Sequence, residues 1–389
     1  MGEKKRQHYV PQFYLKNFVR ENNKFTVLNI KSGKIIEEVP YKKQCYENYY
    51  YGNDGMWEEK LGEIERKTSL IINKILNQST YYPNPKEIST MKEFVLYQRY
   101  RTTRNTENLL NMEWSSAKTC IEMEFDNKRK KLPESILNQI QNQFEQRYRT
   151  MIPQQALDVT SHLLNKIDDL ELIIIQYNNE KQKLISSDNP VIFYNPFNKR
   201  SLGLVNAGLI IIFPISPKKL IVIFDSKMYS KYKGKKIVNL NNENEVKKLN
   251  ALQLIVAKDI VYFQDKNQSE IVKKQYKENK KVRIEFAENG QAKALGTSTN
   301  KMIAFPQSYI PINYEFTFGK VPYKATGFGE NEIDWFPRYI DQEYEKRMQF
   351  RPILFKKIPG RTNQKYTKPN IKNIERFNKL VYEYWNNKL

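Results

Sequence analysis

Apolar residues follow two different spacings along the chain. Leu61, Ile64, Ile71 and Ile75 recur every three or four positions, which predicts an amphipathic helix over residues 57–76. Similar spacing predicts further helices over residues 8–19, 86–131 and 134–166, the last of them bent or broken at Pro153. The first 168 residues are therefore expected to be mostly helical.

Short apolar runs replace the helical spacing after residue 170. They predict strands over residues 171–177, 182–186, 209–214, 220–224, 260–263 and 282–286, and helices over 246–256 and 270–280. An earlier alternating pair, at 25–30 and 34–39, predicts a small hairpin around Lys31-Ser32-Gly33. The expected fold is therefore α+β, with a long-helix N-terminal half packed on a mixed, mostly antiparallel β-sheet half.

The same pattern divides the chain into three regions. Residues 1–168 are the helical region, with an N-terminal motif and the hairpin, and residues 169–290 are a β-rich region with helices. Residues 291–389 are expected to form an irregular basic extension that ends in a helix near 371–386. Residues 166–169 are either a linker or a crossing between two intimately packed halves, and the pattern leaves both open.

The charge of the chain favours a polyphosphate partner. Its 65 Lys and Arg exceed its 43 Asp and Glu, which gives a formal net charge of +22 and a long-range positive potential. An AT-rich genome also inflates lysine, but it does not explain clustering. Residues 337–389 hold 13 Lys and Arg against 5 Asp and Glu, interleaved with aromatic residues. This stretch suits a nucleic-acid surface, or a C-terminal helix that packs its aromatic residues on the core.

Composition also indicates in which cellular compartment the protein is expected. The mean hydropathy is −0.73, and no long uncharged apolar run occurs, so no membrane span is expected. The charged start is not followed by an apolar signal core, so secretion is not expected either. The two cysteines, Cys45 and Cys120, have no metal-ligand spacing, which favours a reducing cytoplasm.

Histidine is scarce, and this restricts the chemistry. The chain has only His8 and His162. His162 lies in a helical run and is interpreted as a packing residue. His8 lies at a proline-started turn, where it either caps the helix or acts as a general acid or base. A hydrolytic site would then use carboxylates with Mg²⁺, or one histidine with Arg and Asp or Glu.

Two other segments carry candidate side chains. Gln98 and Arg101 are three positions apart on a predicted helix and share a face. An arginine there could bind a phosphate through two hydrogen bonds, or pair with Glu65. Asp188 follows a predicted strand, where it is either a carboxylate at the open end of a sheet or the side chain of an Asx-type turn.

Several familiar motifs are missing from the sequence. No P-loop, Gly-x-Ser-x-Gly elbow, His-Glu-x-x-His helix or dinucleotide fingerprint occurs. With only 14 glycines, glycine-rich phosphate cradles are also scarce. An NTPase motor is therefore not expected.

Several polar blocks together resemble a bacterial family known as domain of unknown function 4238. The first block, at residues 8–18, reads His-Tyr-Val-Pro-Gln-Phe-Tyr-Leu-Lys-Asn-Phe. The later blocks follow in the family's order: the helix with Glu58, Leu61 and Glu65, then Gln98-x-x-Arg101-Thr102, Ser187-Asp188-Asn189-Pro190-Val191, and Phe213-Pro214-Ile215-Ser216-Pro217. The resemblance covers roughly residues 5–265, and the family implies no established activity.

What the resemblance implies is a choice of residues. It raises six polar residues above the others: His8, Gln12, Glu65, Arg101, Asp188 and Asn189. Polar blocks from distant positions are more easily explained by one shared pocket than by several separate turns.

We therefore expect a nucleic-acid-directed enzyme, most specifically a nuclease acting on RNA or DNA in anti-phage defence or as a toxin. His8 would be the general acid or base, and Glu65 and Asp188 would orient it or hold a divalent ion such as Mg²⁺. Contacts to the substrate are assigned to Gln12, Gln98, Arg101 and Asn189. Two alternatives stay open: a non-catalytic nucleic-acid-binding protein, and an enzyme acting on a small phosphorylated ligand such as a nucleotide.

Overall fold

The described part of the chain covers the two predicted halves and little of the extension. The computed structural model describes residues 5–127, 133–178, 182–196, 203–206, 208–226, 228–289, 293–295, 302–304, 310–312, 314 and 316–317. The predicted last helix near 371–386 and the basic stretch 337–389 lie outside these residues.

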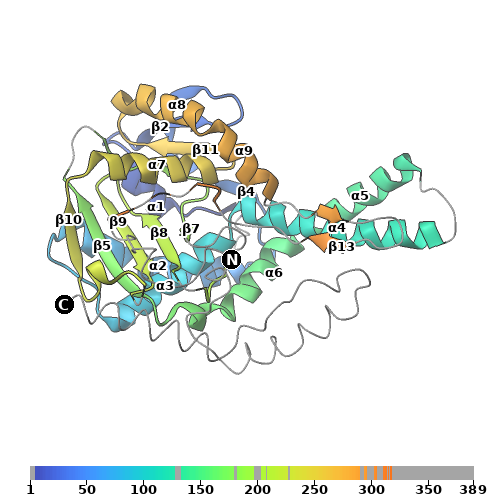
Figure 1. The fold of residues 1–389 in the computed structure, drawn as a ribbon, viewed down its shortest axis with the longest axis horizontal. Coiled ribbons are helices and arrows are strands. Elements are labelled where there is room, and N and C mark those ends of the chain that lie inside the picture. The colour runs from blue at the N-terminus through green and yellow to red at the C-terminus, as the bar shows by residue number, and fades with distance from the viewer. Residues whose placement is uncertain are drawn as a thin grey trace, which may run out of the picture.

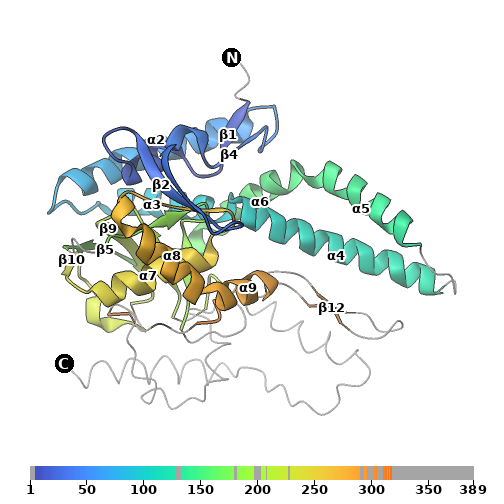
Figure 2. The same ribbon diagram turned by 90° about the horizontal axis from the view of Figure 1, so that it is seen from above.

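Helices dominate the N-terminal half, as the spacing predicts. In chain order the helices are α1 (Gln12–Leu15), α2 (Met56–Asn77), α3 (Pro85–Tyr100), α4 (Thr103–Asn127), α5 (Glu134–Tyr148), α6 (Met151–Ser161), α7 (Glu243–Val256), α8 (Ser269–Glu278) and α9 (Lys280–Asn289). Helices α4 and α5 project from the rest of the molecule as a helical arm (Figures 1 and 2). Within the described ranges, no helix has both the length and the apolar character needed to cross a membrane.

The long helix expected ahead of α5 is two helices, α3 and α4. A capping box starts α3: the Asn84 side chain accepts a hydrogen bond from the Glu87 N–H, and the Glu87 carboxylate accepts one from the Asn84 N–H. The helix stops at Arg101, whose φ of −85° and ψ of 0° are no longer helical. Beside it, Thr102 donates its hydroxyl to Asn189 Oδ1 at 3.2 Å. The break therefore involves a contact with a distant part of the sequence.

The break expected at Pro153 falls earlier in the chain. It lies at Arg149 and Thr150, between α5 and α6. Pro153 is in the first turn of α6, where a proline removes no intrahelical hydrogen bond. The proline therefore marks the start of a helix rather than its interruption.

Strands form two main sheets. The strands are β1 (Arg6–His8), β2 (Lys24–Asn29), β3 (Ile35–Pro40), β4 (Tyr46–Asn48), β5 (Glu171–Tyr177), β6 (Ser186–Ser187), β7 (Ile192–Tyr194), β8 (Ile210–Pro214), β9 (Lys219–Phe224), β10 (Ile237–Leu240), β11 (Ile260–Phe263), β12 (Lys293–Leu295) and β13 (Met302–Ala304). The larger sheet has the order β10-β5-β9-β8-β7; β10 and β5 are parallel and the other neighbours antiparallel. The predicted α+β fold with a mostly antiparallel sheet is confirmed.

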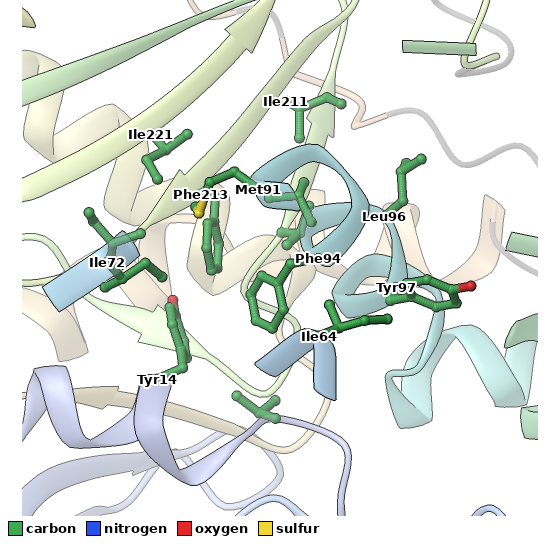
Figure 3. Close-up of a cluster of buried hydrophobic side chains, with 14 of the residues drawn as sticks. Tyr14, Ile64, Ile72, Met91, Phe94, Leu96, Tyr97, Ile211, Phe213 and Ile221 are labelled. Carbon is green, nitrogen blue, oxygen red and sulfur yellow. The ribbon is translucent and has the colours of Figure 1, made fainter. Parts of the chain in front are cut away.

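Both faces of the larger sheet are covered, which explains its continuous apolar runs. From β8, Ile211 and Phe213 pack on the face that meets Met91 and Phe94 of α3 and the apolar side of α2 (Figure 3). Ile210 and its neighbours of the same orientation pack on the opposite face against α7. Helices, sheet and helix therefore form three layers.

The smaller sheet joins the two halves of the chain. Its order is β3-β2-β11-β6, with all neighbours antiparallel. The hairpin predicted near the N-terminus is confirmed as β2 and β3. Its strand β2 pairs with β11, so Thr26 lies opposite Phe263 and Asn29 opposite Ile260. The regions on either side of residue 168 thus share one sheet.

The strand predicted over residues 282–286 is wrong, because this segment lies in α9. Val282 and Phe286 are four positions apart and pack on the same core cluster, while Ile284 is exposed. A five-residue alternation of apolar and polar residues fits a helix face as well as a strand. The contact with α7 decides between them, and it is not visible in local sequence.

Candidate functional site

The N-terminal block turns from a short strand into a short helix. Strand β1 pairs with β4, which places His8 opposite Tyr46, and their ring centroids are 5.4 Å apart. Pro11 then starts α1. Gln12 lies four positions after His8, and its amide Nε2 donates to His8 Nε2 at 3.3 Å. An amide nitrogen only donates, so this nitrogen of the imidazole carries no proton.

Much of the same block anchors the fold. The Tyr14 hydroxyl donates to the Pro214 carbonyl at 2.6 Å and lies 2.7 Å from Ser186 Oγ. Its ring stacks on Phe213 at 5.0 Å, and these side chains belong to the core in Figure 3. Two blocks of the resemblance therefore meet around Tyr14, next to the residue that precedes a third, and this part of their agreement is structural.

The strand opposite His8 is held between two strained residues. Cys45 has φ of 55° and Tyr49 has φ of 53°, a left-handed conformation that costs a non-glycine residue about 1–2 kcal/mol. Backbone hydrogen bonds hold both in place: the Tyr9 N–H donates to the Cys45 carbonyl, and the Tyr49 N–H donates to the Lys5 carbonyl, both at 2.9 Å. Such strain is concentrated at functional sites.

Arg101 is the centre of a buried polar network. Its side chain is 1% exposed. Its Nε and Nη2 donate to Gln98 Oε1 at 2.8 and 2.6 Å, and its Nη1 donates to Glu65 Oε1 at 2.6 Å. Gln98 Nε2 in turn donates to the Tyr9 carbonyl at 3.0 Å. The predicted residues of α2, α3 and the N-terminal block are thus brought together.

This network lies close enough to His8 to affect its charge. The Tyr51 hydroxyl donates to the His8 carbonyl at 3.4 Å. Burial lowers the pKa of the His8 imidazole, and the charges of Arg101 and Arg6 lower it further, against a hydrogen bond with the backbone of Lys42. His8 is therefore neutral near pH 7, and its Nε2 lone pair accepts from the exposed Gln12 amide.

Asp188 is held in a different place and by different partners. Its Oδ1 accepts from the Lys258 N–H at 2.9 Å, and its Oδ2 accepts from the N–H groups of Asp259 and Ile260 at 2.6 and 3.1 Å. Burial raises the pKa of the Asp188 carboxyl, and these backbone donors oppose the rise. The carboxylate fixes the loop between α7 and β11, and the structure does not bring it into contact with His8.

The residues around Asp188 are also joined to one another. Asn189 Nδ2 donates to the Val256 carbonyl at 3.2 Å, and its Oδ1 accepts from Thr102. Ser187 Oγ donates to Gln253 Oε1 at 2.8 Å. We call residues 187–189, together with the loop between α7 and β11, the Asp188 turn. Through Asn189 it contacts Thr102, between α3 and α4.

Sequence reasoning missed several members of both groups. Tyr46 and Tyr51 lie against His8, and Gln253 closes the Asp188 turn. The alternation of residues 46–48 was too short to predict a strand, so the position of Tyr46 opposite His8 had no local signal. Gln253 lies in a predicted helix, and the apolar residues of that helix gave no sign that one of its polar side chains contacts the Asp188 turn.

The two carboxylates proposed to hold a divalent ion do not fit that role. Glu65 Oε1 binds Arg101, and both oxygens of Asp188 bind backbone N–H groups. Throughout the described residues, no three His, Cys, Asp or Glu side chains are grouped as metal ligands. The site geometry therefore supports chemistry by His8 and arginine.

Comparison with known proteins agrees with the blocks described above. The profile of a family described as a protein of unknown function, DUF4238, matches residues 6–267. The chain belongs to the DUF4238 family. The match includes His8, Glu65 and Arg101 as well as the Asp188 turn, whereas the extension after residue 290 lies beyond the DUF4238 region. No curated protein and no solved structure matches the chain significantly.

Proposed function

We propose that this DUF4238 protein is a nucleic-acid-directed enzyme, most specifically a nuclease for RNA or DNA. The observation that carries the proposal is a neutral, half-buried imidazole, His8, next to the positive charges of Arg6 and Arg101. A neutral histidine removes a proton, and the nearby cations stabilise the charge that develops on a phosphate. The net charge of +22 favours a polyphosphate substrate. A role in anti-phage defence or as a toxin is part of the same proposal.

His8 Nε2 is the reacting atom in this proposal. Gln12 is exposed, so its amide can leave Nε2 to an incoming water or ribose hydroxyl. His8 takes the proton while the hydroxyl oxygen bonds to phosphorus and the ester oxygen leaves. The protonated imidazole then returns that proton to the leaving oxygen or to water.

Arg6 is better placed than Arg101 to hold the scissile phosphate. The described hydrogen bonds of the Arg101 guanidinium go to Gln98 and Glu65. Arg6 is exposed, and its guanidinium lies over the Tyr46 ring at 5.2 Å. We assign Arg6 to the phosphate, Arg101 to the positive potential, and Glu65 and Gln98 to the orientation of Arg101.

The test compares the two histidines of the chain. We expect His8→Ala to lower the rate of cleavage of single-stranded or duplex RNA or DNA by at least about 100-fold, because general base catalysis contributes about that much or more. His162→Ala is the matched control, since His162 ends α6 and makes no contact with the site. Activity should also persist in EDTA. Equal cleavage by both variants and the wild type, or no cleavage by any of them, would overturn the proposal.

One observation favours a second candidate, a non-catalytic nucleic-acid-binding protein. The hydrogen bonds of Arg101 and Asp188 are made within the protein, as structural residues require. In that case binding falls steeply with salt concentration. The His8→Ala variant would then bind as the wild type does, and neither protein would cleave.

A further inference from the structure

Three arginines gather around the Asp188 turn and the junction of α3 and α4. Arg104 Nη2 donates to the Ala257 carbonyl at 2.8 Å, and Arg283 Nη2 from α9 donates to the same oxygen at 3.4 Å. Arg283 also donates to the Lys258 carbonyl at 3.1 Å. Two guanidinium groups from distant segments therefore share one carbonyl oxygen and lie next to each other.

Arg99 is the third member of this group. Its Nη1 donates to Asn189 Oδ1 at 3.4 Å, and its guanidinium lies 5.3 Å from the centre of the Phe193 ring. Its positive charge contributes to a lowered pKa of Arg104, which burial brings to about 10. Arg99, Arg104 and Arg283 are called the arginine triad below.

The arginine triad forms no salt bridge with a carboxylate in the part of the chain that the structure describes. Burial lowers the pKa of Arg104 and Arg283 and the Asp188 carboxylate opposes this lowering, but the Asp188 oxygens accept hydrogen bonds from three backbone N–H groups. Glu107 and Asp259 lie nearby, and both pair with Lys258, at 2.6 and 3.9 Å. Nearby carboxylates thus contribute a negative potential at the guanidinium groups but form no described salt bridge with them.

Two of the three guanidinium groups also keep an unused donor. Arg104 Nε and Arg283 Nε are buried and have no hydrogen-bond partner. The Arg104 residue is only 9% exposed. A buried donor of a charged group without a partner costs about 1–3 kcal/mol or more. A ligand that accepts these hydrogen bonds would remove that cost.

We propose that the arginine triad is a binding site for a phosphate group. Several guanidinium groups side by side match the oxygen atoms of a phosphate, and each offers two donors in one plane. Arg99 and Arg283 are half-buried rather than enclosed, so the ligand reaches the site from the surface. The phosphate can be free or part of a nucleotide or nucleic acid, because the same oxygens are recognised in each.

This inference does not depend on the activity proposed for His8. The described hydrogen bonds of the arginine triad go to Asn189, Ala257 and Lys258, whereas His8 bonds with Gln12. A catalytically inactive His8 variant is therefore expected to bind phosphate at the arginine triad with unchanged affinity. Loss of phosphate binding in the triad variants likewise leaves the His8→Ala test intact.

The experiment titrates the full chain with inorganic phosphate at constant ionic strength, measured by calorimetry. We expect the wild type to bind phosphate at the triad, with a Kd at least about tenfold weaker in Arg283→Gln, a loss of about 1.4 kcal/mol. Arg149→Gln is the matched control: it removes the same charge at the exposed end of α5, outside the triad. Arg283→Lys should give an intermediate affinity, because a lysine keeps the charge without the paired donors.

Each outcome decides the proposal. If the wild type binds no phosphate at concentrations up to about 10 mM, which is about ten times a Kd of about 1 mM, the proposal is overturned. An equal loss in Arg149→Gln and Arg283→Gln shows general charge attraction and also overturns it. If Arg283→Gln does not fold, Arg99→Gln replaces it, since Arg99 is half-buried and donates a single long hydrogen bond. Titration with a mononucleotide and a short oligonucleotide then identifies which source of phosphate binds more tightly.

Discussion

The His8 region and the Asp188 turn both contain polar blocks of the DUF4238 family. They differ in which groups form hydrogen bonds with these polar side chains. On one side the polar partner of His8 Nε2 is the exposed Gln12 side chain, and Arg6 is also exposed. On the other side Asp188 and Asn189 bind backbone groups of one loop. A polar block in a sequence is therefore not in itself a sign of chemistry. The unused donors and acceptors distinguish a site from a structural turn.

The largest expected effect is on the structural side. Asp188→Ala removes a buried side chain and the acceptor of three backbone N–H groups, so we expect the free energy of unfolding to fall by about 3 kcal/mol or more. Urea denaturation measures this. Asp259→Ala is the control on the same loop, since its side chain is mostly exposed, and it should cost less than about 0.5 kcal/mol. Equal costs for the two variants would contradict the structural role of Asp188.

A smaller loss is expected at the pair between α2 and α3. Glu65→Ala leaves the buried Arg101 guanidinium without its carboxylate, and the free energy of unfolding should fall by about 1–3 kcal/mol. This range is lower than for a fully buried pair because Glu65 is 27% exposed. Glu63→Ala breaks an exposed pair with Lys67 on the same helix and should leave the stability nearly unchanged, because water screens exposed ion pairs. Both are measured by urea denaturation, and an equal loss would show that the network adds no stability.

The smallest effect is the dependence of stability on pH at His8. Its pKa is lower in the folded protein than the ordinary value of 6.5, so the unfolded chain binds a proton more readily. Stability therefore decreases as the pH falls from 6.5 toward the folded pKa, by about 1.4 kcal/mol for each unit between the two values. The difference in unfolding free energy between pH 7.5 and 5.5 should be smaller in His8→Gln than in the wild type. An unchanged difference would show that His8 is not buried as described.

Much of the fold is predictable from local sequence, and the exceptions share one cause. The strands at β5, β8, β9 and β11 are evident because their apolar runs are covered on both faces. The end of α3, the helix at α9 and the strand β4 depend on partners far along the chain. The candidate site divides in the same way. The pairing of Glu65 with Arg101 was one of the alternatives that the spacing suggested, whereas the backbone donors of Asp188 lie about seventy residues away.

The pairing of β2 with β11 has a consequence for how the chain is made. These strands are separated by more than two hundred residues, so at about 5–20 residues per second the hairpin leaves the ribosome some 10–50 s before its partner. Such non-local pairing makes folding slow. The hairpin therefore cannot complete its sheet until synthesis has passed residue 263. A chain released earlier would expose the edge of β2, which is available for pairing with other chains.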